Sequence, residues 1–183
     1  MSGNGIHDSL DSTTGKLTKL LAEDGYVAVD YIYPPTNSIT ALLRNKKDVL
    51  GFQNMLVDGS TIIAHSRFCR VVLKMLQKNT FETEIDDIYL IAPATKRAWN
   101  IPFTAFKKIR GDIIVIYNPH DLAILAGAMA LFHPFGTAGR SGLKETHPKI
   151  KNYRWPSFEG KYNHSFFFND DNIQDLKEFI TGN

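Results

Sequence analysis

The stretch that decides the fold runs from Asp48 to Tyr117. Its apolar segments are DVLGFQNMLVDGSTIIAHSRF (48–68), CRVVLKMLQKN (69–79), DDIYLIAPATKRAWNIPF (86–103) and GDIIVIY (111–117). Asp-Gly, Pro-Ala-Thr-Lys and Arg-Gly breaks divide these segments, which are rich in β-branched and aromatic residues. Such runs between turn residues are typical of strands. The stretch therefore predicts a β-sheet.

Two hairpins and one further strand are predicted inside this stretch. Asp58-Gly59 is a strong hairpin cue because it lies between two apolar runs. The predicted strands are residues 48–57 and 60–68 in the first hairpin, 88–92 and 98–103 in the second, and 113–117 in a strand covered on both faces. A strand is also predicted over residues 26–34, and a short strand over 166–168.

Helices are predicted where apolar residues recur every three or four positions, which is the spacing of one helical face. From about residue 68, Val71, Val72, Met75 and Leu76 share one face. The same reasoning predicts helices over 15–24, 122–132 and 171–180, and a helix or irregular segment over 38–47. Asn118 to Asp121 are expected to cap the apolar helix 122–132, and Asp170 or Asp171 the last helix.

These elements predict the α/β class, with a central mixed sheet of about five to six strands flanked by helices. Residues 13–183 are predicted to form a single domain that follows a flexible N-terminus at 1–12. Residues 134–164 are rich in glycine, proline, bases and aromatic residues but show little periodicity. They are predicted to form a loop-rich basic appendage, and such long loops are often functional.

Composition places the chain among ordinary globular proteins. Its 183 residues are 43% hydrophobic and 22% charged, which argues against disorder. The apolar run Leu122–Phe132 is shorter than the roughly 20 residues that cross a bilayer, so no membrane partner is expected. The polar N-terminus does not resemble a secretory signal. The lone cysteine, Cys69, suits a reducing cytoplasmic compartment and is predicted to be a buried structural thiol.

Charge is distributed in blocks along the chain. Bases outnumber acids in residues 44–78 and 140–161, whereas acids outnumber bases in 1–30 and 165–183. Two basic blocks between acidic ends favour a polyanionic partner. Ordinary solvated surfaces would give the same pattern, and both interpretations stay open. The oligomeric state is left open as well.

The order of elements from residue 15 to 117 resembles that of the PD-(D/E)XK nuclease superfamily, in particular its intron-encoded endonucleases and resolvase-like members. The resemblance rests on a helix with Glu23, on Lys47-Asp48-Val49-Leu50 before the Asp58-Gly59 tip, and on the strand pair that ends at Ile101-Pro102. It implies a nuclease-like fold and a Mg²⁺-dependent endonuclease that hydrolyses phosphodiester bonds in nucleic acid, with DNA as the expected partner.

The resemblance also implies site residues. Asp48 would bind Mg²⁺ with Glu23 or with Glu84 and Asp86 from the acidic cluster 82–87. Arg67 or Lys74 would contact the phosphate. Where the family carries acid-x-lysine, this chain has His65-Ser66-Arg67. Arginine stays protonated and does not act as a base, and histidine is a poor ligand for a hard cation.

Bases interleaved with aromatic residues mark a candidate nucleic-acid surface, because cations meet phosphates and rings stack on bases. Its predicted members are Arg140, Lys144, Lys149, Lys151, Arg154 and Trp155. Alternatively, Tyr153 and Trp155 anchor the segment in the core. A non-catalytic nucleic-acid- or protein-binding module on the same scaffold is therefore a second hypothesis.

A third hypothesis is an enzyme that binds a small phosphorylated ligand. The segment from Gly136 to Gly142 has three glycines at a spacing of three, which could form a backbone nest for phosphate. The remaining histidines, His120, His133, His147 and His164, show no recognisable Ser-His-Asp or zinc spacing. They are predicted to be loop or capping residues.

Overall fold

The computed structural model describes residues 14–28, 45–129, 136–156 and 162–182. The chain divides into two compact units, which are considered separately below. The helical unit is formed by Met1–Pro34 with Ser165–Asn183, and the sheet unit by Pro35–His164. The predictions for residues 1–12 and for most of 26–34 and 38–47 fall outside the described residues.

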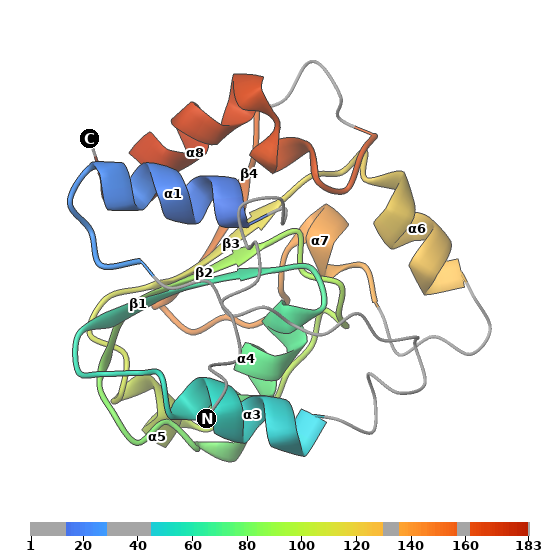
Figure 1. Ribbon diagram of the computed structural model, residues 1–183. Coiled ribbons are helices and arrows are strands. Elements are labelled where there is room, and N and C mark those ends of the chain that lie inside the picture. The colour runs from blue at the N-terminus through green and yellow to red at the C-terminus, as the bar shows by residue number, and fades with distance from the viewer. Residues whose placement is uncertain (1–13, 29–44, 130–135, 157–161, 183) are drawn as a thin grey trace, which may run out of the picture. The chain divides into compact units, whose positions relative to one another are not determined.

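The sheet unit is built on four parallel strands in the order β1-β2-β3-β4 (Figure 1). The strands are β1 (Ser60–His65), β2 (Ile85–Ile91), β3 (Ile113–Tyr117) and β4 (Ile150–Arg154). The predicted α/β class is confirmed. The described strands are all parallel rather than mixed, and the predicted total of five to six strands is not confirmed.

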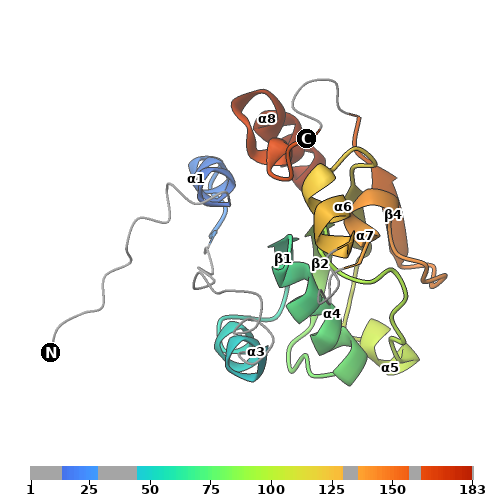
Figure 2. The same ribbon diagram turned by 90° about the vertical axis from the view of Figure 1, so that its right-hand side faces the viewer.

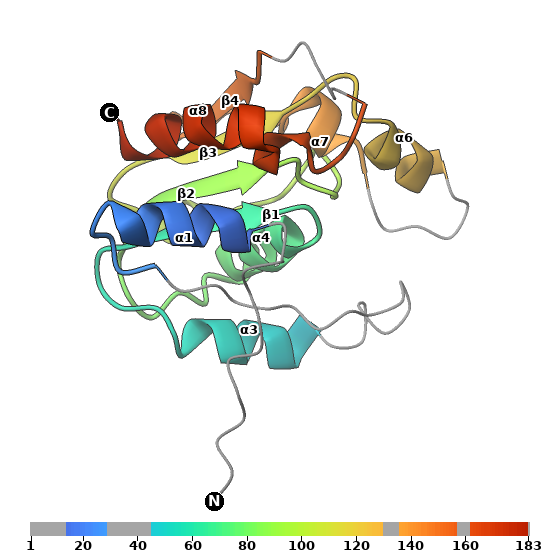
Figure 3. The ribbon, with the colours of Figure 1, turned by 45° about the horizontal axis from the view of Figure 1, so that its top comes forward.

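Helices connect the strands, because a parallel pair cannot be closed by a hairpin. The connections contain α4 (Phe68–Lys78), α5 (Phe103–Phe106), α6 (Leu122–Met129) and α7 (Ala138–Ser141), and α3 (Asn45–Gln53) precedes β1. Helices α3, α4 and α5 lie on one face of the sheet (Figures 1 and 2). Helices α6 and α7 lie beyond the ends of the strands toward which the arrows point (Figure 3).

The core of the sheet unit joins the apolar face of α4 to the strands. The predicted helix start near residue 68 is confirmed, and Val72, Met75 and Leu76 are fully buried. In β2, Ile88 and Leu90 are fully buried as well. A buried aliphatic side chain of this size contributes about 1.5–3 kcal/mol.

The first predicted hairpin is wrong. Residues 45–53 form α3, in which Phe52 is buried and its ring meets that of Phe68 edge-on at 4.9 Å. The Asp58-Gly59 cue does mark a turn, because Gly59 has φ +82°. This turn leads from α3 into β1 rather than from one strand to another.

The second predicted hairpin is also wrong. Strand β2 forms as expected, but residues 98–103 do not return as a strand. The backbone N–H of Trp99 donates to the side chain of Glu145 at 2.6 Å, and Pro102 has no N–H to donate. Two ladder donors are thereby removed, and α5 follows at Phe103.

Residues 134–164, predicted as a loop-rich appendage, contribute α7 and the strand β4 to the sheet unit. In the helical unit, α1 (Gly15–Glu23) and α8 (Asp170–Thr181) are joined by ion pairs of 2.7 Å, Lys16–Asp170 and Lys177–Asp24. The expected short strand at 166–168 is a 3₁₀ helix, η2 (Phe166–Phe168). None of the helices described here has the length and apolar character needed to cross a bilayer.

Gly142, directly after α7, offers a test of the packing between α7 and β4. It has φ +72°, and an added Cβ would lie 2.3 Å from Oδ1 of Asn152, whose amide bonds both backbone groups of Leu143. Its ψ of −179° puts Gly142 in an extended region with positive φ that is essentially restricted to glycine. We expect Gly142→Ala to lower the free energy of unfolding by about 1–3 kcal/mol for the backbone and about 1–3 kcal/mol more for the contact. Urea unfolding measures both.

The matched control is Gly59→Ala. Gly59 has a similar φ of +82°, but the nearest atom to an added Cβ lies at an ordinary 3.5 Å. This variant should show the backbone cost of about 1–2 kcal/mol and little more. Equal losses at the two positions would contradict the tight contact with Asn152.

Candidate active site at the carboxyl ends of the strands

Three polar side chains follow three strands of the sheet unit at the same edge. Ser66 comes directly after β1, Asp121 lies four residues after the end of β3, and His164 follows β4. The carboxyl ends of parallel strands meet at one edge, which is where open α/β sheets bind their ligands. Helices α6 and α7 lie at this edge (Figure 3).

Ser66 occupies a tight turn between a strand and a helix. Its φ is +54°, in the left-handed region that side chains other than glycine rarely adopt. The turn is held from both sides, because the Ser66 N–H donates to Ile91 O at 3.0 Å and the Ser66 carbonyl accepts from Ala94 N–H at 3.1 Å. Strain of this kind is retained where surrounding structure fixes it, often at functional sites.

The three side chains form a continuous hydrogen-bonded relay. Nε2 of His164 lies 2.7 Å from Oγ of Ser66, and Nδ1 lies 2.6 Å from Oδ2 of Asp121. An ionised carboxylate accepts only, so Nδ1 carries the proton and Nε2 presents its lone pair to the serine hydroxyl. This is the geometry of a nucleophile, a general base and an orienting acid.

Asp121 is held in place by contacts other than the one with His164. It is fully buried, and its second oxygen, Oδ1, accepts the backbone N–H of Ile124 at 2.9 Å at the start of α6. The predicted capping role of this segment is thus confirmed for Asp121. Arg140 holds the same turn by donating from Nε to the Pro119 carbonyl at 2.8 Å. The acid is therefore rigid, and both of its oxygens are engaged.

His164 is partly accessible, with 19% of its side chain exposed. Its loop is tied to the acid loop, because Leu122 N–H donates to the Tyr162 carbonyl at 3.4 Å. The ring of His65 lies beside it, with centroids 4.9 Å apart. His164 thus contacts Asp121, Ser66 and the ring of His65 while part of its side chain stays exposed.

His65 remains neutral beside the base. Burial of its ring, and then the charge of nearby His164, lower the pKa of His65 to about 3. Its Nε2 is enclosed although the residue as a whole is half-buried. His65 is therefore not a second base beside His164 above about pH 3.

The lowered pKa predicts a loss of stability in acid. A histidine titrates near 6.5 in the unfolded chain and at about 3 here, so below pH 6.5 the unfolded state binds the extra proton. We expect His65 to reduce the free energy of unfolding by up to about 1.4 kcal/mol per pH unit between pH 6.5 and 3. Urea unfolding of wild type and His65→Asn at pH 7, 6, 5 and 4 measures this slope.

In His65→Asn the free energy of unfolding should change less steeply with pH between pH 7 and 4. Because slopes are compared, a loss of stability that is the same at every pH, such as poorer packing, cancels. Parallel curves for the two proteins would contradict a buried, neutral His65.

Cys69 is not a second nucleophile. It is fully buried, and its thiol points to the carbonyls of Ala64 at 3.2 Å and Ile91 at 3.6 Å. Burial raises the pKa of the Cys69 thiol well above its usual range. The thiolate needed for reaction is thus suppressed, and the predicted structural role is confirmed.

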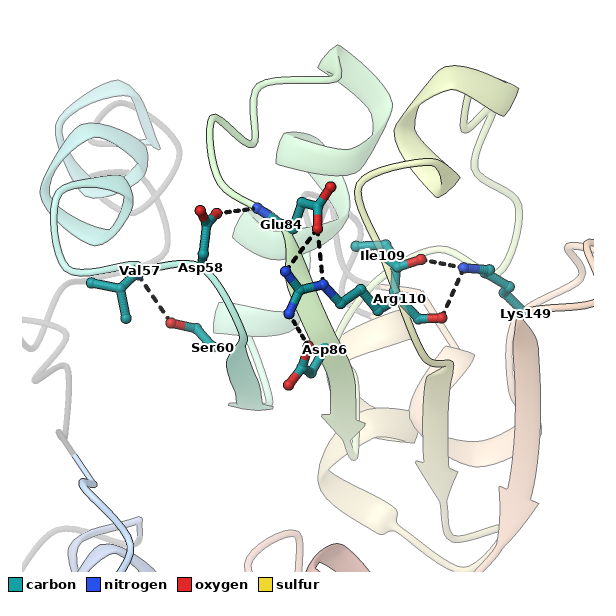
Figure 4. Close-up of polar contacts among 8 residues, drawn as sticks. All are labelled: Val57, Asp58, Ser60, Glu84, Asp86, Ile109, Arg110 and Lys149. Carbon is teal, nitrogen blue, oxygen red and sulfur yellow. Dashed lines mark hydrogen bonds and ion pairs between the residues drawn. The ribbon is translucent and has the colours of Figure 1, made fainter.

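The predicted metal ligands Glu84 and Asp86 lie at the opposite edge of the sheet, where β2 begins (Figure 4). Arg110 binds both, with Nη2 2.8 Å from Oε2 of Glu84 and Nη1 3.2 Å from Oδ1 of Asp86. Asp58 accepts the Glu84 N–H at 2.9 Å close by. In the described part of the chain, no group of three or more His, Cys, Asp and Glu residues is placed to hold a metal ion.

The other residues of the nuclease hypothesis lie on separate elements. Glu23 ends α1 in the helical unit, and Asp48 lies in α3 with its side chain outside the described residues. Arg67 is the N-cap of α4, so it does not share a strand face with His65. Lys74 is half-buried on α4, where burial and then Arg70 and Lys78 lower its pKa. The Mg²⁺ and nuclease assignments stay predictions.

The predicted nucleic-acid surface is divided among several roles. Lys149 directs its ammonium to the carbonyls of Ile109 and Arg110 (Figure 4), and Trp155 is 5% exposed. Lys144, Lys151 and Arg154 are exposed. Nucleic-acid binding by these residues stays a prediction.

The glycines of the proposed phosphate loop have close neighbours. An added Cβ on Gly136 would lie 2.4 Å from Cα of Lys96, and one on Gly139 would lie 3.0 Å from the Ala92 carbonyl carbon. Together with Gly142, they let α7 and the residues beside it pack closely against Ala92, Lys96 and Asn152. Close packing therefore accounts for the glycine spacing without a ligand.

The sequence pattern does not single out Ser66, Asp121 and His164 as site residues. It places Ser66 in a strand, and it shows no triad spacing for His164, which is predicted to be a loop histidine. The available signal was the segment Ala64-His65-Ser66-Arg67-Phe68 between an apolar strand and an amphipathic helix. It matches the strand–serine–helix pattern of G-x-S-x-G but has alanine and phenylalanine where that motif has glycines.

Comparisons of the chain with protein-family models, with curated proteins and with solved structures found no match. The site is therefore interpreted from its own geometry.

Proposed function

We propose that this protein is a serine hydrolase that cleaves carboxylic esters by acyl transfer through Ser66. The observation that carries the proposal is the relay Ser66–His164–Asp121, with links of 2.7 and 2.6 Å. Both distances lie in the range of roughly 2.6–3.2 Å expected between a nucleophile, its base and the orienting group.

In the acylation step, Oγ of Ser66 attacks the ester carbonyl carbon while its proton moves to Nε2 of His164. The carbon–oxygen bond to the alcohol then breaks, and the leaving alcohol takes the proton back from Nε2. Asp121 stabilises the imidazolium that forms between the two events and keeps the ring in one tautomer. The product of this half-reaction is an acyl ester on Ser66.

Deacylation repeats these steps with water. His164 takes a proton from water, the hydroxide attacks the acyl carbon, and the carboxylic acid leaves as Ser66 regains its proton. The side chain of His164 is 19% exposed, so water reaches part of the ring.

Charge on the carbonyl oxygen requires hydrogen-bond donors in the transition state. The backbone N–H of Arg67 follows the nucleophile at the start of α4, which is the position of one oxyanion donor in strand–serine–helix enzymes.

The topology supports the proposal independently of the distances. α/β-Hydrolases carry their triads in the chain order serine, acid, histidine, with the serine in a sharp turn from a strand to a helix. Here the order is Ser66, Asp121, His164, and the turn at Ser66 leads from β1 into α4. The likeness is one of arrangement and serves as analogy.

The test is covalent labelling with a reporter-bearing alkyl fluorophosphonate. Attack by an activated serine forms an oxygen–phosphorus bond and releases fluoride, and His164 takes the serine proton. We expect mass spectrometry to find the adduct on the peptide that contains Ser66 in folded protein and not in heat-unfolded protein.

Ser60 provides an internal control, because its Oγ accepts the Val57 N–H at 3.0 Å at the other edge of the sheet (Figure 4). It should stay unlabelled. If folded protein is not labelled at Ser66 and hydrolyses no p-nitrophenyl ester, the proposal is overturned.

A further inference from the structure

The helix that follows the catalytic acid has an unusual outer surface. Helix α6 begins at Leu122, directly after Asp121, and its sequence LAILAGAM has no charged or hydrogen-bonding side chain. A surface helix normally turns a polar face to water. In α6 the residues Leu122, Ala123 and Ala126 are exposed, and Leu122 is 52% exposed.

The loop that carries the base adds an aromatic residue to this surface. Tyr162 lies two residues before His164 and is 56% exposed. Its carbonyl accepts the Leu122 N–H at 3.4 Å, and its ring meets that of His120 at 6.1 Å. We call Leu122, Ala123, Ala126 and Tyr162 the apolar patch.

The patch adjoins the relay along the chain at two points. Leu122 adjoins Asp121 in the chain, and Tyr162 belongs to the loop that presents His164. Contiguous exposed apolar surface of this kind commonly marks a binding site. The patch adjoins Asp121 and the loop of His164, two members of the relay. We therefore assign it to the part of a ligand attached to the carbonyl that Ser66 attacks.

We infer that the substrates are esters of medium- or long-chain carboxylic acids, and that the apolar patch binds the acyl chain. This inference rests on the proposed function and specifies its substrate class. The chemistry is that of hydrocarbon transfer from water: a methylene that is fully removed from water strengthens binding about fourfold. An open patch covers one side of the chain, so each methylene is expected to contribute about half of that effect on a logarithmic scale.

The experiment compares p-nitrophenyl butanoate with p-nitrophenyl octanoate below the concentration at which either aggregates. Four added methylenes, each half covered, should raise kcat/KM about 15-fold in the wild type. In the double variant Leu122→Ser with Tyr162→Ser, the octanoate-to-butanoate ratio should fall below about threefold. A ratio cancels any loss that is common to both substrates.

Val57→Ser is the matched control. Val57 is 67% exposed but lies before β1, at the opposite edge of the sheet from Ser66 (Figure 4). This variant should keep the wild-type ratio. Both substrates are cleaved at the same bond. A change in the octanoate-to-butanoate ratio that is confined to the double variant therefore reports contact between the patch and the acyl chain.

The outcomes separate this inference from the proposed function. Labelling of Ser66 with hydrolysis of both esters at equal kcat/KM would overturn acyl-chain binding and leave the hydrolase intact. The same conclusion would follow from a 15-fold ratio that persists in the double variant. Absence of both labelling and hydrolysis would overturn the proposed function itself.

Discussion

Replacing Ser66 by alanine is expected to lower kcat for p-nitrophenyl esters about 10⁶-fold. The Ser66 hydroxyl oxygen is the atom that forms the acyl-enzyme, and it lies 2.7 Å from Nε2 of His164. Loss of a triad serine typically has this magnitude. Steady-state kinetics with wild type and Ser66→Ala, matched for folded concentration, measures the change.

The control for this prediction is Ser60→Ala, in which an equivalent hydroxyl is removed at the far edge of the sheet. It should leave kcat within about twofold of the wild type. If Ser66→Ala keeps more than about one hundredth of the wild-type kcat, ester hydrolysis does not depend on the relay.

The backbone at Ser66 allows a second readout from the same position. A non-glycine residue at φ +54° is strained by roughly 1–2 kcal/mol, and glycine is not. The free energy of unfolding of Ser66→Gly, measured with urea, should therefore exceed that of Ser66→Ala by about 1 kcal/mol. Both variants should be inactive. Such a difference would show that the fold sustains strain in order to present a nucleophile.

The pattern of neighbouring residues was sufficient to predict those helices and strands that depend on nearby sequence alone. The change of period at Phe68 marks the start of α4, and the continuous run Ile113–Tyr117 marks β3. The cue at Asp58-Gly59 correctly marks a turn but does not determine what the turn connects. Whether a turn joins two strands depends on pairing between distant segments, which a short window of sequence does not contain.

The relay lies outside the reach of local pattern for the same reason. Ser66, Asp121 and His164 are more than forty residues apart in the chain. They meet because β1, β3 and β4 are parallel and in register, so that the loops at their carboxyl ends gather at one edge. Spacing between histidines along the chain could not reveal this contact.

The acidic cluster before β2 shows the converse. Considered by themselves in the sequence, the four carboxylates of residues 82–87 fit either a divalent-ion site or a solvated loop. The pairing of β2 with the segment before β3 brings Arg110 to them, since its N–H donates to the Ile85 carbonyl at 2.7 Å. The negative charges of Glu84 and Asp86 are paired with Arg110, which lies more than twenty residues further along the chain.

Replacing Asp121 by asparagine is expected to lower kcat about 10⁴-fold while leaving KM and the fold nearly unchanged. Asp121 serves two donors at once, the Ile124 N–H through Oδ1 and His164 through Oδ2. An asparagine has one oxygen for two donors. If that oxygen keeps the cap on α6, the amide NH₂ faces Nδ1 of His164.

A histidine that accepts a hydrogen bond at Nδ1 carries its proton on Nε2. In that tautomer Nε2 has no lone pair for the Ser66 hydroxyl, so the general base is removed although its ring stays in place. Loss of activity through the wrong tautomer has the magnitude given above in serine proteases. The same argument predicts that Asp121→Asn still reacts with the fluorophosphonate, but far more slowly than the wild type.

The variant Asp121→Ala separates the two duties of the carboxylate. It removes the cap as well as the orienting acid, so the free energy of unfolding should fall by at least about 1 kcal/mol relative to Asp121→Asn. Kinetics and urea unfolding on both variants distinguish the roles. If Asp121→Asn keeps kcat within tenfold of the wild type, Asp121 is a helix cap that happens to contact His164, and the assignment of a triad fails.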